Sequence, residues 1–189
     1  QMLDEAGVRR AAIESLAENC SDGVIAPAFW LLVAGLPGLF AYKMLNTADS
    51  MIGHMNDKYR DFGRASAKFD DAANWIPARL TGMLLIAAGS LRLGAGKARA
   101  ALGTMLRDAR LHRSPNAGWP ESAMAALTGL ALAGPRVYHG DVANEPMLNA
   151  AGRRDAGPED IERAISITSI LFWLTASMAA AFVVFHCAT

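Results

Sequence analysis

The segment AISITSILFWLTASMAAAFVVF, residues 164–185, decides the fold class of this chain. Its twenty-two residues carry no charge, which is enough helix to cross a hydrocarbon core of about 30 Å. A second uncharged run, VIAPAFWLLVAGLPGLFAY, occupies residues 24–42. Its prolines predict kinks, and its glycines allow close helix contacts. Both segments predict a membrane protein built from helices.

Two further apolar stretches are shorter. Residues 80–91 and 122–134 carry no charge over twelve and thirteen residues, a length that favours buried or re-entrant helices over full crossings. Residues 4–19 have the pattern of an amphipathic helix with Asp4 as its N-cap. Because no strand pattern and no repeat occur, we expect an all-α, multi-pass membrane protein whose helices are kinked, short or re-entrant.

Composition excludes several classes of function. The chain has 189 residues, of which 52% are hydrophobic and 19% are charged, and this length fits one domain. Its 18 basic and 18 acidic residues cancel, which leaves no global field to attract a nucleic acid. Cys20 and Cys187 have neither the spacing of a zinc site nor the number for a disulfide framework. Since the first residue is Gln1, we interpret residues 1–189 as one membrane-embedded domain from the C-terminal portion of a longer chain.

The distribution of charge predicts an orientation in the membrane. Residues 92–113 carry six basic side chains and one acidic side chain. Loops rich in lysine and arginine stay on the cytoplasmic side. We therefore expect this loop to face the cytoplasm, together with the polar residues that precede it.

Residues 42–79, YKMLNTADSMIGHMNDKYRDFGRASAKFDDAANWIPAR, form a polar run between apolar segments. Carboxylates and amides are interleaved there with lysine and arginine. Because Mg²⁺ prefers oxygen ligands and guanidinium groups bind phosphate, the run predicts a Mg²⁺–phosphate site on the cytoplasmic face. The alternative is a solvated loop with surface ion pairs. The candidate residues in the run are Asn46, Asp49, Arg60, Arg64, Asp70, Asp71 and Arg79.

Two segments outside this run add candidates. Glu14, Glu18 and Asp22 recur at four-residue spacing on one helix face. They form either a third set of oxygen ligands or an ordinary solvent-facing stripe. The turn SPNAGWPE, residues 114–121, places Asn116 before a helix N-terminus, which either only starts the helix or also binds a phosphate. No standard nucleotide-binding motif occurs.

Several stretches of the chain are similar to one protein family. They are ESLAENCSDGVIAPAFW at 14–30, GLPGLFAYKMLNTADSMIGH at 35–54, YRDFGRASAKFDDAANWIPARL at 59–80 and SPNAGWPESAMA at 114–125. In these motifs, and in their order, the sequence resembles the CobD/CbiB family of cobalamin biosynthesis, the adenosylcobinamide-phosphate synthases. GPRVYHGD at 134–141 is a weaker match.

The resemblance implies a multi-pass protein of the inner membrane with an active site facing the cytoplasm. Members of the family attach aminopropanol, or its phosphate, to a propionate carboxyl of adenosylcobyric acid and so form an amide. The chain would then be an amide-bond-forming ligase with ATP and Mg²⁺ as cofactors. Its implied partners are this corrinoid substrate, membrane lipid and other late cobalamin enzymes.

The chemistry of amide formation suggests separate roles for the acids and the bases. The predicted Mg²⁺ ligands are Asp49, Asp70, Asp71 and Glu14, with Glu18 as the alternative to Glu14. The predicted cofactor-binding residues are Arg60, Arg64, Arg79, Asn46 and Asn116. The residues expected to accept the proton of the incoming ammonium group are Glu18 and Asp22.

Two other functions stay open at this point. The chain could be a non-catalytic membrane scaffold that gathers late corrinoid enzymes, or a corrinoid carrier. The carrier is disfavoured because charged residues sit in loops rather than inside the long apolar segments, where transport pathways place them.

Overall fold

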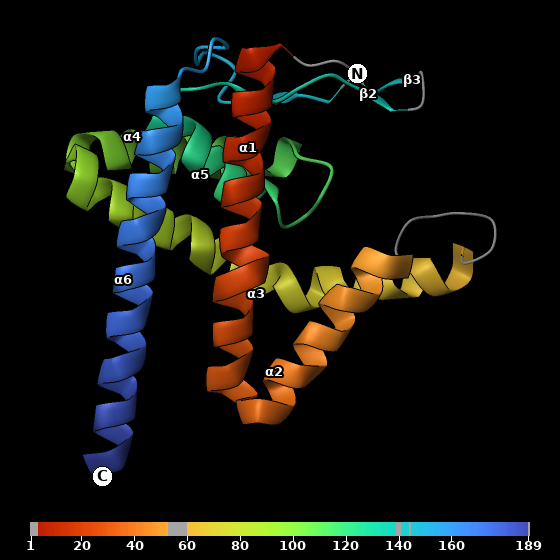
Figure 1. Ribbon diagram of the computed structural model, residues 1–189, viewed down its shortest axis with the longest axis vertical. Coiled ribbons are helices and arrows are strands. Elements are labelled where there is room, and N and C mark those ends of the chain that lie inside the picture. Colours follow the sequence, from red (N-terminus) through yellow and green to blue (C-terminus); the bar gives the residue numbers. More distant parts are fainter. Residues whose placement is uncertain (1–3, 53–59, 139–140, 144, 189) are drawn as a thin grey trace.

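The computed structural model describes residues 4–52, 60–138, 141–143 and 145–188. In these ranges the chain is almost entirely helical, which confirms the all-α prediction (Figure 1). The helices are α1 Glu5–Cys20, α2 Ala26–Ile52, α3 Arg60–Leu93, α4 Ala95–Asp108, α5 Gly118–Thr128 and α6 Pro158–Ala188, with a π-helical turn at Ser21–Ile25 and a 3-10 turn at Ala109–Leu111. The antiparallel strand pairs are β1 Leu132–Ala133 with β4 Met147–Leu148, and β2 Arg136–Tyr138 with β3 Asp141–Ala143.

The first helical stretch begins where the sequence predicts. Asp4 is the N-cap of α1, and its carboxylate accepts a hydrogen bond of 2.7 Å from the backbone N–H of Gly7. The helix then continues through the π-helical turn directly into α2. A π-helical turn adds one residue to the helical repeat, and such turns occur often at functional sites.

α2 reverses direction in its middle. Ala34 and Gly35 leave helical geometry, and Gly35 has φ +64°, a value that favours glycine because it has no Cβ. Figure 1 shows the chain descending along α1, turning at the bottom of α2 and rising again. Residues 24–42 therefore form a bent hairpin rather than a kinked crossing, and the bend lies at Ala34 and Gly35 rather than at a proline alone. Hydropathy measures the length of an apolar run, and the bend depends on the backbone of Gly35.

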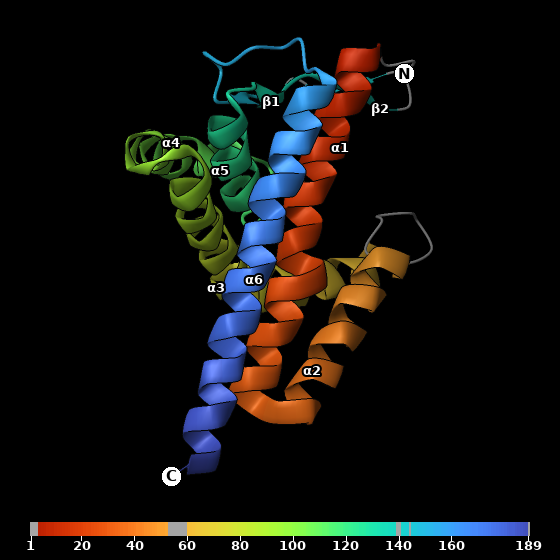
Figure 2. The ribbon, with the colours of Figure 1, turned by 60° about the vertical axis from the view of Figure 1, so that its left-hand side comes forward.

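α3 crosses the other long helices. In Figures 1 and 2 it runs across α1 and α6, which lie side by side. The rising arm of α2 reaches the N-terminal half of α3. Residues 80–91, expected to be a separate short helix, form the C-terminal part of α3 and bury Leu85 and Ala88.

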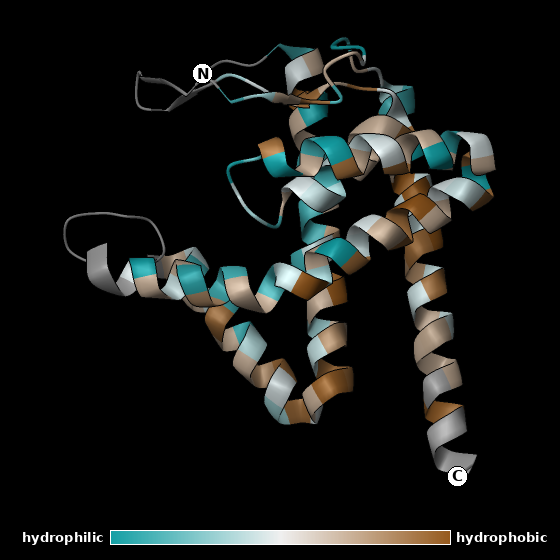
Figure 3. Ribbon diagram, turned by 180° about the vertical axis from the view of Figure 1, so that it is seen from behind, coloured by the Kyte–Doolittle hydropathy of each residue, from teal (hydrophilic) through white to brown (hydrophobic). Residues whose placement is uncertain are grey.

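Three segments are long and apolar enough to cross a membrane: Glu5–Met51, Gly63–Leu93 and Pro158–Ala181. Figure 3 shows hydrophobic residues at the bend of α2 and along much of α6, whereas hydrophilic residues recur along α3 and α4. Many large apolar side chains are exposed to the surroundings, and Trp173 is 75% exposed. A lipid environment would cover such surface, which supports the prediction of a membrane protein.

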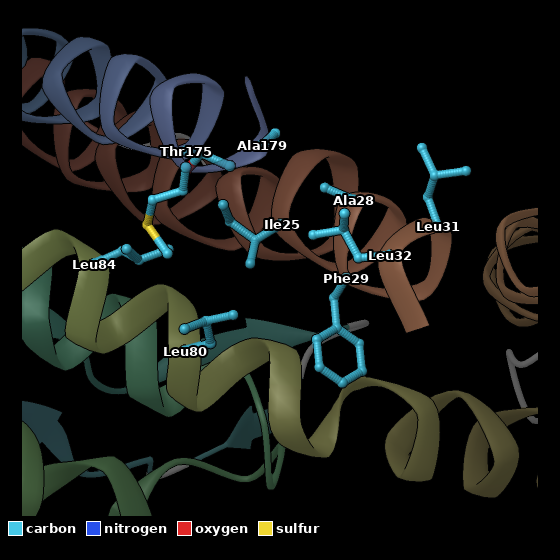
Figure 4. A pocket seen from close by; sticks show the side chains of 10 residues that line it. Ile25, Ala28, Phe29, Leu31, Leu32, Leu80, Leu84, Thr175 and Ala179 are labelled. Carbon is cyan, nitrogen blue, oxygen red and sulfur yellow. The ribbon is translucent and has the colours of Figure 1, made fainter. Parts of the chain in front are cut away.

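The buried core lies where α1, α3, α4, α5 and α6 meet. Its fully buried side chains include Leu85, Met105, Met124, Leu127 and Ile167. A separate apolar groove of about 280 Å³ opens between α2, α3 and α6 (Figure 4). Leu80, Leu84 and Phe29 project toward it from two of these helices. The core holds α3 in place, so the polar side chains of its first half have a fixed support.

Candidate functional site

A polar cavity of about 230 Å³ lies where α1, α2, α3 and the loop before α5 come together. Its lining consists almost entirely of carboxylate, amide and hydroxyl side chains. The lining residues are Glu18, Asp22, Asn46, Asp49, Ser50, Asp70, Asp71, Asn74, Ser114, Asn116 and Ala117. We call this space the acidic cavity. It brings together seven of the eleven candidate residues from the sequence, which lie on three separate stretches of the chain.

The hairpin of α2 is what assembles this cavity. Asp22 lies in the π-helical turn, at the top of the descending arm, and Asn46 and Asp49 lie on the rising arm. The reversal at Gly35, at the bottom of α2 in Figure 1, lets these two residues line the same cavity as Asp22. A straight helix would place residues 22 and 49 about 40 Å apart, at 1.5 Å per residue. The bend therefore creates the site.

A buried tyrosine joins the arms of the hairpin to α3. The side chain of Tyr42 is 2% exposed. Its hydroxyl oxygen lies 3.0 Å from the backbone oxygen of Asp22 and 3.0 Å from Oδ1 of Asn74. The single hydroxyl proton is donated to one of these acceptors at a time. Tyr42 thus fixes the π-helical turn relative to α3.

Asp70 is the most firmly held carboxylate of the cavity. Asn74 donates from Nδ2 to its Oδ2 over 3.0 Å, and Asn46 donates from Nδ2 to its Oδ1 over 3.4 Å. Both oxygens thus have one amide donor, and each carboxylate oxygen keeps a second lone pair for a ligand. This arrangement resembles the supporting hydrogen bonds that orient metal-binding carboxylates.

Asn116 ties the loop before α5 to α3. Its Nδ2 donates to the backbone oxygen of Asp71 over 2.8 Å and lies 3.4 Å from Oδ1 of the same residue. Asn116 is 6% exposed, and its Oδ1 has no hydrogen-bond partner within the part of the chain that the structure describes. The open atom is an acceptor, which suits a cation or an N–H donor and not a phosphate oxygen.

The acidic cavity carries a large unbalanced negative charge. Among residues 4–52, 60–138, 141–143 and 145–188, none of its carboxylates forms an ion pair with a basic side chain. These carboxylates are Glu18, Asp22, Asp49, Asp70 and Asp71. Like charges gathered in a partly enclosed space repel one another, and a bound cation relieves that repulsion.

The donor set fits Mg²⁺ bound partly through water. Within the described residues, no three His, Cys, Asp or Glu side chains are placed to hold a metal ion by themselves. Mg²⁺ keeps several waters and binds through one or two carboxylates together with substrate phosphates, rather than in an all-protein cage. The oxygen atoms of Asp49, Asp70, Asp71 and Asn116 are of the right kind for such a site.

A second cavity, of about 340 Å³, lies beside the acidic cavity and is lined by basic side chains. Its lining residues are Arg79, Ala109, Arg110, His112, Arg113, Ser114, Pro115 and Trp119. We call it the basic cavity. Ser114 lines both cavities and so marks their boundary. The sequence predicted Arg79 but missed Arg110 and Arg113, because their loop was interpreted only as a signal of membrane orientation.

Three candidates lie outside both cavities or outside the described side chains. Oε1 of Glu14 accepts a hydrogen bond of 2.8 Å from the backbone N–H of Ala133 in β1, and Glu14 is 8% exposed. It therefore supports β1, and we leave it out of the metal site. Arg64 is exposed on α3 and lines neither cavity. The side chain of Arg60 falls outside the described residues.

The loop between the cavities is held by its own hydrogen bonds. Nδ1 of His112 accepts from the backbone N–H of Ser114 over 3.1 Å. Oγ of Ser114 accepts from the backbone N–H groups of Asn116 and Ala117 over 3.3 and 3.2 Å. Burial lowers the pKa of His112, so its imidazole is neutral at pH 7. Ser114 and Asn116 are therefore presented on a fixed support.

We expect Gly118→Ala to destabilise the protein by about 1–3 kcal/mol, the usual cost of overpacking. A Cβ at Gly118 would overlap the backbone oxygen of Ala109 and the Cβ of His112, and the backbone cannot move without displacing the loop. Gly103→Ala is the control, since a Cβ there meets nothing within 4 Å. Thermal unfolding in detergent measures both variants. A midpoint for Gly118→Ala equal to that of the unmodified protein would show that the loop tolerates the displacement.

Comparison with known proteins identifies the family. The family model described as CobD/Cbib protein matches residues 1–168. The chain belongs to the CobD/CbiB family. This confirms the resemblance seen in the motifs. No solved structure matches the chain.

Three of the curated relatives illustrate how much of a longer protein the chain matches. The protein named Cobalamin biosynthesis protein CobD of Brucella suis is 65% identical over 176 residues, which are 93% of this chain and 53% of the relative. The protein of the same name from Rhizobium meliloti is 62% identical over 87% of this chain and 50% of the relative. That from Rhodobacter capsulatus is 56% identical over the same shares. The chain spans about half the length of the curated relatives it matches.

Proposed function

We propose that the chain contributes the catalytic centre of a membrane enzyme of cobalamin biosynthesis. The enzyme would use ATP and Mg²⁺ to join adenosylcobyric acid to aminopropanol, or to its phosphate, through an amide bond. The observation that carries the proposal is the acidic cavity, in which five carboxylates without ionic partners among the described residues lie beside a basic cavity. The pathway is supported by the names of the relatives.

The reaction needs both kinds of charge. A carboxylate and an ammonium group do not condense in water unless the carboxyl is first activated, most simply by phosphoryl transfer from ATP. Mg²⁺ supplies charge neutralisation on the phosphates when it is bound. The chain's own contribution would be to orient these groups and exclude water, since phosphoryl transfer requires positioning more than covalent help from the protein.

The proposed roles follow the geometry of the acidic cavity. Asp49, Asp70 and Asp71 face the space from α2 and α3, and we assign them to the metal and its waters. Glu18 and Asp22 face it from the end of α1 and the π-helical turn. Their negative charge would attract the ammonium group of the amine, and one of them would accept its proton before the nitrogen attacks.

The proposed location is the inner membrane, with both cavities on the cytoplasmic side. Three apolar helices support the membrane assignment, and the basic residues of α4 and the loop after it support the orientation. A cytoplasmic face would give the site access to ATP.

A reconstituted assay tests the function. The membrane-embedded protein is purified in detergent and supplied with adenosylcobyric acid, aminopropanol phosphate or aminopropanol, ATP and Mg²⁺. The expected result is a corrinoid amide, formed in proportion to ATP consumed. Corrinoid binding without amide or ATP turnover would contradict the proposal and favour a scaffold. Flux of corrinoid across vesicles without amide formation would favour a carrier.

A further inference from the structure

The basic cavity is built around a guanidinium group with a fixed position. The Cζ atom of Arg79 lies 3.9 Å from the ring centre of Trp75 and 4.7 Å from that of Trp119. Its Nη1 also donates a hydrogen bond of 2.5 Å to the backbone oxygen of Trp75. Stacking against aromatic faces holds the plane of a guanidinium group while its N–H edge stays available. Arg79 is therefore positioned as a donor before any ligand arrives.

Two of the three arginines of this cavity, Arg79 and Arg110, are not balanced by an acid among the described residues. Arg110 and Arg79 line the same cavity, where their like charges repel, and neither pairs with a carboxylate among the described residues. Of the acids nearby, Glu145 lies 3.4 Å from Nε of Arg113, and Glu121 lies 3.6 Å from Nε2 of the neutral His112.

We propose that the basic cavity binds a phosphate group of a substrate, with Arg79 and Arg110 as its charged donors. An oxyanion would relieve the repulsion between these two side chains and accept their N–H groups. Inorganic phosphate, a nucleotide and a phosphorylated amine share this chemistry. The identity of the phosphate-bearing substrate rests on the proposed function, whereas the binding of a phosphate group in this cavity does not.

Ser114 gives the proposal a geometric consequence. Because it lines both cavities, a ligand with its phosphate at Arg79 and Arg110 extends past Ser114 toward the carboxylates of the acidic cavity. The basic cavity would hold a negative group and the acidic cavity a positive group. The two groups belong either to one ligand or to two ligands side by side. Phosphate is thereby placed next to the cation site and not inside the cluster of carboxylates, where it would be repelled.

The first test measures binding without turnover. Phenylglyoxal modifies accessible arginines, and mass spectrometry reports the extent of modification at Arg79 and Arg110. In the detergent-purified protein, ATP, inorganic phosphate and aminopropanol phosphate are added separately. Protection of both arginines by at least one of them is expected, while Arg99, exposed on α4 and outside both cavities, stays reactive. Equal reactivity with and without all three ligands would overturn the proposal, whether or not the protein forms amides.

The second test identifies the source of the phosphate. Arg110→Gln removes one charged donor from an exposed position, and Arg99→Gln is the matched control. Loss of a hydrogen bond to a charged group predicts a rise in KM of about tenfold or more, with a smaller change in kcat. A rise for ATP assigns the cavity to the nucleotide, and a rise for aminopropanol phosphate assigns it to the amine substrate. Unchanged KM values for both would contradict the inference even in a fully active enzyme.

Discussion

Asp70→Asn is expected to lower kcat/KM for amide formation by about 10²–10³-fold, the range expected when an electrostatic group at a reacting centre is removed. The variant has the same shape but no charge. It also replaces one carboxylate oxygen by an NH₂ group, which would face the Nδ2 donor of either Asn46 or Asn74. Two N–H groups that face each other cannot form a hydrogen bond. The new side chain would therefore keep only one of the two hydrogen bonds that orient it, and its remaining oxygen would be less firmly directed.

The measurement should separate metal binding from general damage. Amide formation is followed over a range of Mg²⁺ concentrations, and Mn²⁺ binding is counted by electron paramagnetic resonance. Asp70→Asn should raise the Mg²⁺ concentration needed for half-maximal rate and weaken Mn²⁺ binding. Asp155→Asn is the control, because Asp155 is 86% exposed and lies outside both cavities. Undiminished activity with an unchanged Mg²⁺ dependence would remove Asp70 from the metal site.

The sequence predicted much of this cavity because its residues are chemically conspicuous. Carboxylates and amides next to apolar segments stand out wherever they lie in the chain, so Asp49, Asp70 and Asp71 could be grouped before their positions were known. Ser114 also lines the cavity and Tyr42 holds its frame together, yet an isolated hydroxyl is common at any surface. Their function depends on which neighbour the fold gives them.

Two differences between the sequence predictions and the structure have a specific cause. The apolar run at 24–42 was interpreted as a span kinked at its prolines, because hydropathy does not report that Gly35 adopts φ +64°. Glu14 was grouped with Glu18 because they lie one turn apart on α1. The strand that binds Glu14 has only two residues, too few for any sequence pattern to predict.

The arginines of the basic cavity show what a count of charges in the sequence cannot reveal. Arg110 and Arg113 lie in a loop whose many basic residues already have an explanation in the positive-inside rule. Only the packing of the 3-10 turn after α4 against the loop before α5 places them beside Arg79. A count of charges in a loop cannot distinguish residues that orient a membrane protein from residues that bind a ligand.

Asp22→Asn is expected to abolish amide formation with aminopropanol while leaving activation of the carboxyl largely intact. Asp22 lies in the π-helical turn, across the acidic cavity from the side chains of α3. A protonated amine cannot attack until it loses a proton, and a positioned base contributes about 10²–10⁴-fold to such a step. An asparagine at this position keeps the size of the side chain and cannot accept that proton.

Hydroxylamine provides the matched substrate, because it is uncharged at neutral pH and needs no base to become nucleophilic. If the carboxyl of adenosylcobyric acid is activated, hydroxylamine traps it as a hydroxamate, which forms a coloured iron complex. Asp22→Asn should therefore lose amide formation by about 10²-fold or more and retain hydroxamate formation within a few-fold. Glu18→Gln, measured in the same way, shows whether the other carboxylate shares the role. An equal loss of both products in Asp22→Asn would assign Asp22 to activation or to the metal, and would contradict its role as the proton acceptor.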